Sequence, residues 1–138
     1  MSIKLLTESL QNEYDKLCQS IKPADKPYRF LTERRNDGSP HVEINENDYH
    51  YVVTERGAEN SRRTTKEPNE ILYWMISDIT FWMAVDFELK HRIEGRDFRR
   101  LMFAKQLELL QKAHLNWAEK RRKKIEAILT ENPFMDKL

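Results

Sequence analysis

The sequence contains little cysteine and little glycine, and both shortages exclude classes of function. Cys18 is the only cysteine in 138 residues, so an internal disulfide or a cysteine-based zinc site cannot form, and an oxidising compartment is not indicated. Three glycines are too few for a glycine-rich phosphate loop, and there is no Gly-x-Ser-x-Gly nucleophile motif. We therefore expect a cytoplasmic protein in which Cys18 is a small core residue rather than a nucleophile.

The sequence also lacks a dominant charge, a metal-ligand pattern and a long apolar run. With 24 basic and 23 acidic residues the formal net charge is +1, so no global field attracts nucleic acid or membranes. The four histidines are too scattered for metal-ligand spacing, and we expect neither a metal nor a cofactor. Asp78 and Asp86 interrupt the apolar residues around Trp74, and residues 1–8 contain no continuous apolar segment, so we expect no membrane span and no signal peptide.

The composition is that of a helix-rich globular domain. Hydrophobic residues make up 39% of the chain and charged residues 34%, which differs from the composition of disordered chains. A chain of this length buries roughly two thirds of its unfolded surface, which is enough for one core. We expect a single domain over residues 1–138.

The first half of the sequence predicts one helix followed by strands. Apolar residues recur every three or four positions over residues 3–21, which predicts an amphipathic helix with Ser2 as its N-cap and a stop at Pro23. From residue 28 onward the period changes to two, which predicts an antiparallel meander of about four strands. The strands are expected at residues 28–33, 41–44, 49–55 and 59–65, with a hairpin turn at residues 36–38 and further turns at residues 45–48 and 56–57.

A long helix is expected to form the centre of the second half. Pro68 suits the first turn of a helix. The glutamates beside it stabilise a helix that begins there, because they lie near the positive end of the helix dipole. The apolar residues between Ile71 and Leu89 cover nearly the whole circumference of a helical wheel. A helix that is apolar all round is normally buried. We therefore expect the stretch 71–103 to contain a buried central helix.

Two further helices are predicted after the central one. Gly95 is expected to separate the central helix from a second helix that has Asp97 near its start. A final helix is expected to begin with a capping box from Asn116 to Glu119 and to end at Pro133. Since a meander with one apolar face needs a partner layer, the fold class is α+β, with an N-terminal helix, the meander, and three C-terminal helices packed on the sheet.

Charged side chains interrupt the apolar central helix. Burying a charge is costly unless it is paired, so these acids either face water or pair with arginines, and helical spacing alone leaves this open. We favour a structural charge network, whose members are Asp78, Asp86, Glu88, Arg62, Arg63, Arg92 and Arg99. The alternative is a small enzyme, in which burial raises the pKa of Asp86 or Glu88 and suits that carboxyl to acid–base chemistry.

The predicted strands between residues 43 and 59 carry carboxylates and tyrosines. Side chains of these kinds suit a basic protein partner. The candidate partner-binding residues are Glu43, Glu46, Asp48, Tyr49, Tyr51, Glu55 and Glu59. A second alternative is nucleic-acid binding by the basic block Lys120, Arg121, Arg122, Lys123 and Lys124. Aromatic residues that could stack on bases are not interleaved with this block, so we favour the protein partner.

Several segments together resemble one bacterial family. They are YVVTERG at residues 51–57, RRT at 62–64, EILYW at 70–74, MA at 83–84, EL at 88–89, HRIE at 91–94, DFRR at 97–100, QLELL at 106–110, Trp117, IL at 128–129 and PF at 133–134. This pattern is similar to the immunity protein 63 family of polymorphic toxin systems, which include contact-dependent growth inhibition. The resemblance extends over about residues 41–136.

The resemblance implies a function. It implies a small cytoplasmic bacterial protein that is not an enzyme, needs no cofactor, and binds the cognate C-terminal toxin domain of an effector one-to-one, thereby blocking the toxin. It assigns no residue to the toxin interface. Immunity families that neutralise nucleases often carry an acidic surface, and this chain differs in being nearly neutral. The chemistry of the toxin is therefore left open.

Overall fold

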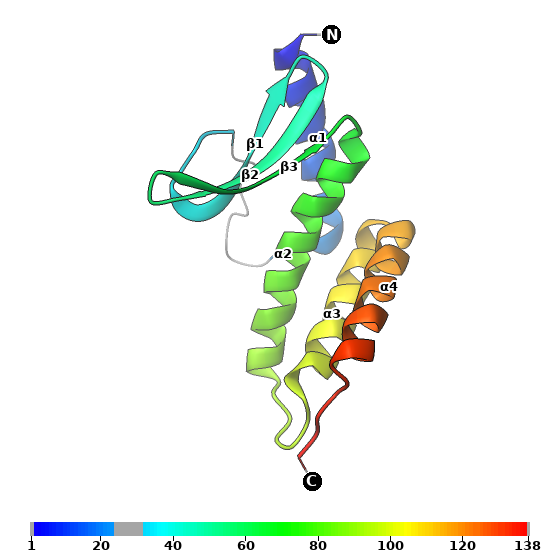
Figure 1. The fold of residues 1–138 in the computed structure, drawn as a ribbon. Coiled ribbons are helices and arrows are strands. Elements are labelled where there is room, and N and C mark those ends of the chain that lie inside the picture. Colours follow the sequence, from blue (N-terminus) through cyan, green and yellow to red (C-terminus); the bar gives the residue numbers. More distant parts are fainter. Residues whose placement is uncertain (1, 24–31, 138) are drawn as a thin grey trace. The chain divides into compact units, whose positions relative to one another are not determined.

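The computed structural model describes residues 2–23 and 32–137 and shows an α+β protein. One helix precedes a three-stranded sheet, and three helices follow it (Figure 1). The elements are α1 (Ile3–Ile21), β1 (Asp37–Asn45), β2 (Asp48–Glu55), β3 (Ala58–Thr65), α2 (Pro68–Lys90), α3 (Phe98–Ala113) and α4 (Leu115–Glu131). The predicted order of helices and strands is confirmed, although the sheet has fewer strands than the sequence predicts.

The chain divides into two compact units, which we call the sheet unit and the helical unit. The sheet unit consists of Met1–Leu17 and Ala24–Met75, and the helical unit consists of Cys18–Pro23 and Ile76–Leu138. The helices α1 and α2 each contribute residues to both units. The single domain that the sequence predicts stays a prediction.

Helix α1 follows its sequence signals closely. Ser2 Oγ accepts a hydrogen bond from Leu5 N at 3.2 Å, which makes Ser2 the N-cap. Within the sheet unit, Leu10 and Tyr14 are buried on the apolar stripe of the helix. The helix ends at Ile21, ahead of Pro23, as the sequence predicts.

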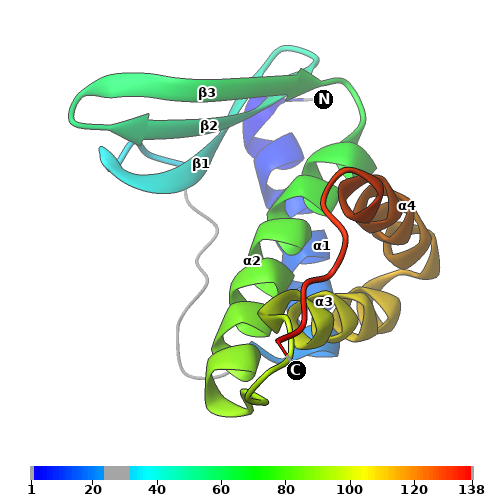
Figure 2. The same cartoon turned by 60° about the horizontal axis from the view of Figure 1, so that its bottom comes forward.

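The sheet is antiparallel with the order β1-β2-β3, as Figure 2 shows. Strands β1 and β2 are joined by Glu46 and Asn47, at the predicted polar turn. Strands β2 and β3 are joined by Arg56 and Gly57, whose φ angles of 52° and 79° are both positive. Two central residues with positive φ form the tight turn whose twist matches that of a hairpin.

The prediction of about four strands is wrong among the described residues, which form three. Residues 28–31 of the predicted first strand lie outside the described part of the chain, and residues 32–33 are not in a strand. The predicted hairpin turn at residues 36–38 is instead the entry into β1, which begins at Asp37. The reason is that Asn36 O accepts a hydrogen bond from Arg56 N at 3.1 Å, so this segment pairs with the end of β2 rather than turning back.

Helix α2 is buried for most of its length but not all round. Its first four turns include Ile71, Ile76 and Thr80, which have no exposed surface. Farther along, Trp82 is 57% exposed and Leu89 is 59% exposed. The prediction of a fully buried central helix is therefore wrong for the second half of α2, where apolar side chains face solvent beside charged ones.

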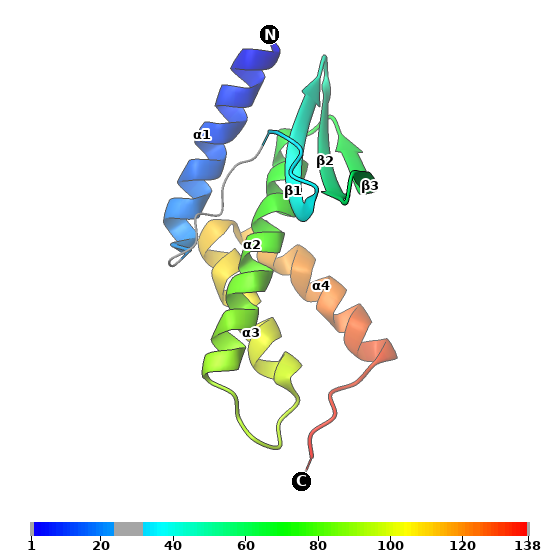
Figure 3. The same ribbon diagram turned by 90° about the vertical axis from the view of Figure 1, so that its left-hand side faces the viewer.

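Helices α3 and α4 follow α2 along the chain, as the ribbon in Figure 3 shows. Local capping fixes the start of each of them. Asp97 caps α3, since its carboxylate accepts a hydrogen bond from Arg99 N at 2.9 Å. The predicted capping box from Asn116 to Glu119 is wrong, because His114 caps α4 by accepting from Asn116 N at 3.2 Å. Glu119 instead pairs with Arg122 one turn along α4.

The helical unit has an apolar core and one polar connection between its helices. The core contains the buried residues Ala84, Met102, Phe103 and Ile125. Gln106 on α3 is 2% exposed, and its amide donates to Ser77 O of α2 at 3.0 Å and accepts from Arg121 Nε of α4 at 2.9 Å. Since a buried amide must be paired, Gln106 constrains how the three helices meet.

We predict that Gly95→Ala loosens the C-terminal tail of the helical unit. The φ of Gly95 is 82°, and a Cβ there would lie 2.8 Å from Lys137 O, while Gly95 O accepts a hydrogen bond from Lys137 N at 2.7 Å. The left-handed backbone costs a non-glycine residue about 1–2 kcal/mol. In addition, the clash of the new Cβ with Lys137 O should break the hydrogen bond from Lys137 N to Gly95 O. Amide exchange of Lys137 should accelerate.

The matched control is Gly57→Ala, since Gly57 has a φ of 79° but open space around its Cβ position. This control costs stability through the backbone alone and leaves the exchange of Lys137 unchanged. Equal exchange of Lys137 in both variants would contradict the proposed clash.

Candidate interface on the three-stranded sheet

Polar side chains from all three strands gather on one face of the sheet unit. The register pairs Glu43 of β1 with His50 of β2, and His50 with Thr64 of β3. It also places His41 and Arg62 on either side of Val52. Since alternate residues of a strand face the same side, these side chains share one face. A register shift in the pairing of β2 with β3 also brings Glu59 beside Arg62. We call this face the polar sheet face, with the members His41, Glu43, His50, Glu59, Arg62 and Thr64.

Arg62 connects the two outer strands across β2. Its guanidinium donates to both carboxylate oxygens of Glu59, at 2.7 and 3.1 Å, and to Glu43 Oε1 at 3.1 Å. Bidentate arginine–carboxylate pairs are stronger and more directional than single contacts. The same guanidinium holds the pKa of the Glu59 carboxyl below its ordinary value. Both carboxylates therefore remain charged on this face near neutral pH.

A buried histidine continues this chain of contacts. His41 is 2% exposed, and its Nε2 lies 2.7 Å from Glu43 Oε2. The hydrogen bond from His41, followed by that from Arg62, lowers the pKa of Glu43. His41 Nδ1 has no hydrogen-bond partner in the part of the chain that the structure describes. The sequence gives only a weak signal of this pair, namely the spacing of two along a strand.

The two candidate tyrosines lie on the opposite side of β2 from His50. Tyr49 is 6% exposed and Tyr51 is 4% exposed. The guanidinium of Arg63 lies 5.1 Å from the centre of the Tyr51 ring and 4.9 Å from that of Trp74. This cation–π arrangement covers the Tyr51 ring. Both rings are thus packed inside the sheet unit, which corrects the expectation that they offer surface contacts to a partner.

The remaining acidic candidates are exposed at the two turns. Glu46 is exposed and Asp48 is half-buried beside a hollow of about 460 Å³, lined by Ile3, Asn45, Glu46, Asn47, Asp48 and Lys66. Glu55, at the other turn, is exposed and accepts a hydrogen bond from Asn60 at 3.1 Å. We call residues 45–48 the acidic turn. Glu46 and Glu55 are therefore accessible to a partner, and Asp48 is partly accessible.

The residues of the predicted charge network occur in separate places. Glu88 is 3% exposed and pairs with Arg92 at 2.8 Å. Arg99 pairs with Asp97, also at 2.8 Å, whereas Arg62 and Arg63 make the contacts described above. The other two acids of α2 differ in exposure, since Asp78 is half-buried and Asp86 is exposed.

These placements weaken both alternative functions. The Arg92 guanidinium lowers the pKa of Glu88, whereas a proton-transfer acid in an apolar pocket needs a raised one. Within the basic block, Arg121 donates to Gln106 and Arg122 pairs with Glu119 and Glu126. Arg121 and Arg122 are therefore engaged within the protein.

Two further features of the described residues concern metal ligands and membrane spans. Among them, no three histidine, cysteine, aspartate or glutamate side chains are grouped so that they could hold a metal ion. Of the helices in the described part, none combines the length and apolarity needed to cross a membrane.

A family model described as immunity protein 63 matches residues 45–127. The match begins at the acidic turn and includes β2, β3, α2, α3 and most of α4. It covers more than half of the chain, while α1 and most of β1 precede it. The comparisons with curated proteins and with solved structures returned no match.

We predict that Arg62→Met raises the pKa of Glu59 and Glu43 toward their ordinary values. A lowered folded-state pKa adds stability above the unfolded value of about 4.3 and loses it as pH falls through the folded value. The variant should therefore lose less stability than the wild type on acidification below that value. Carboxyl ¹³C titration by NMR measures both pKa values, and unchanged values would contradict the bridging role of Arg62.

Proposed function

The chain belongs to the immunity protein 63 family, and we propose that it neutralises the toxin domain of a polymorphic toxin system, such as one of contact-dependent growth inhibition. The family match over residues 45–127 is the observation that supports this function. Immunity proteins act by binding a cognate toxin protein. In this proposal the chain binds the C-terminal toxin domain one-to-one in the bacterial cytoplasm, as a single domain without enzymatic activity or cofactor.

The acidic turn and the polar sheet face are the proposed toxin-binding surface. Glu46, Asp48 and Glu55 supply accessible carboxylates at the two ends of β2. Glu43 and Glu59 present charged oxygens on the polar sheet face, where Arg62 fixes their geometry. Such a surface complements a basic patch, for example one that a toxin uses for an anionic target. Covering that patch would block the toxin.

The edge strand β3 adds a second kind of contact. The order β1-β2-β3 leaves β3 at one edge of the sheet, and its residues before Thr65 are all exposed. An exposed edge presents unpaired backbone groups to which an extended segment of a partner can add as a further strand. Backbone pairing would supply affinity, while the neighbouring carboxylates would select a basic partner.

We predict that the double variant Glu46→Lys and Asp48→Lys associates more slowly with the cognate toxin domain. Reversing the exposed charge of Glu46 and the half-buried charge of Asp48 removes the electrostatic attraction that steers encounter, so the association rate should fall about tenfold at low salt. The difference should shrink as salt is added, because exposed charges are screened. Stopped-flow mixing measures the rate.

The control is Glu108→Lys with Glu131→Lys on α3 and α4, which changes the net charge equally at exposed positions of the helical unit. It should leave the association rate close to the wild-type value. If both double variants slow association to the same extent, net charge rather than the acidic turn governs encounter, and the proposed surface is wrong.

A further inference from the structure

Exposed apolar side chains gather at the end of the helical unit where α2 leads into α3. Ile93 is 53% exposed, Phe98 52% and Met135 80%. All three line one hollow of about 470 Å³, together with Arg92, Arg96 and Lys137. We call these six residues the loop-end surface. Apolar side chains grouped around a hollow and mixed with arginines are typical of a protein-binding site.

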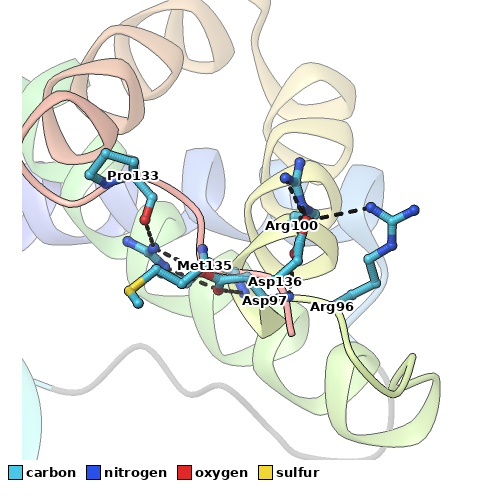
Figure 4. A network of polar contacts seen from close by, with 7 residues as sticks. Arg96, Asp97, Arg100, Pro133, Met135 and Asp136 are labelled. Carbon is cyan, nitrogen blue, oxygen red and sulfur yellow. Dashed lines mark hydrogen bonds and ion pairs between the residues drawn. The ribbon is translucent and has the colours of Figure 1, made fainter. Parts of the chain in front are cut away.

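Backbone and side-chain hydrogen bonds hold this surface in shape (Figure 4). The C-terminal tail lies against the connection between α2 and α3, because Lys137 N donates to Gly95 O at 2.7 Å. Asp97 accepts from Met135 N at 2.8 Å through its carboxylate, while its own backbone N donates to Asp136 Oδ1 at 2.8 Å. The tail residue Met135 is thus fixed beside Phe98, and little ordering is needed on binding.

The ion pairs around this surface are oriented with their cations outward. The side chain of Arg92 is 58% exposed while that of its partner Glu88 is 4% exposed. Arg96 is 61% exposed against 18% for Asp136. Although each pair is neutral in sum, the carboxylates lie beneath and the guanidiniums face solvent. Glu94 is also exposed at this hollow, but the exposed cations Arg92, Arg96 and Lys137 outnumber it. The charge presented to a partner is therefore positive, in contrast to that of the acidic turn.

We propose that the loop-end surface binds an acidic protein segment that inserts an apolar side chain into the hollow. Guanidiniums held by the buried Glu88 and the half-buried Asp136 are ready to bind carboxylates of the partner. The apolar side chains around the hollow receive the anchor. A nucleic acid fits less well, because bases need aromatic platforms and Phe98 is the one aromatic lining residue. This site is independent of the proposed toxin surface on the sheet.

The experiment uses the full chain and a fluorescein-labelled peptide, Asp-Glu-Leu-Phe-Glu-Asp, titrated by fluorescence anisotropy at low salt. The wild type should bind the peptide saturably, and the methyl signal of Met135 should shift in NMR spectra. Arg96→Glu should weaken binding about fivefold, since it replaces an exposed attraction with a repulsion. Met135→Asp should weaken binding by a similar factor, because it removes apolar lining and adds a negative charge.

Lys123→Glu is the control, because it makes the same change in charge at an exposed position of α4. It should bind the peptide as the wild type does. The proposal is overturned if the peptide does not bind saturably, or if Lys123→Glu weakens binding as much as Arg96→Glu. If a labelled single-stranded oligonucleotide binds the wild type more tightly than the peptide does, and Arg96→Glu abolishes that binding, the surface binds nucleic acid instead.

Discussion

The contact of Arg62 with two carboxylates is the interaction on which the candidate toxin surface depends. Arg62 lies on β3, yet it binds Glu43 of β1 as well as Glu59 of its own strand, so it links the outer strands across β2. Glu43 in turn lies 2.7 Å from the buried His41. Charges fixed in this way lose little side-chain entropy when a partner binds. A nearly neutral chain can therefore present a defined acidic surface.

Elements with local signals were predictable from the sequence, and those fixed by distant contacts were not. Pro23 stops α1 and Gly57 allows the turn between β2 and β3, each through its own backbone preference. Both features were therefore predicted correctly. Asn36 also resembles a turn residue, but a hydrogen bond from Arg56, 20 positions along the chain, makes it the entry to β1. The contact of Met135 with Asp97 is likewise long-range, and no periodicity in the sequence indicates it.

The same distinction applies to the candidate site. The exposure of Glu46 follows from its place in a polar turn, which sequence reasoning identified. The burial of Tyr49 and Tyr51 was missed, because alternation along a strand shows that residues share a face but not which face is covered. In the ion pair of Glu88 with Arg92 the carboxylate is buried and the guanidinium is exposed, so the loop-end surface presents positive charge. The acidic turn presents negative charge, although the formal net charge of the chain is +1.

The central claim is that this chain confers immunity by binding a toxin, and growth rescue tests it most directly. The cognate toxin domain would be induced in bacteria with and without the chain. If the claim is correct, the toxin alone arrests growth, co-expression restores it, and both proteins purify as a one-to-one complex. Continued arrest with the folded chain present in excess, and no complex recovered, would contradict it.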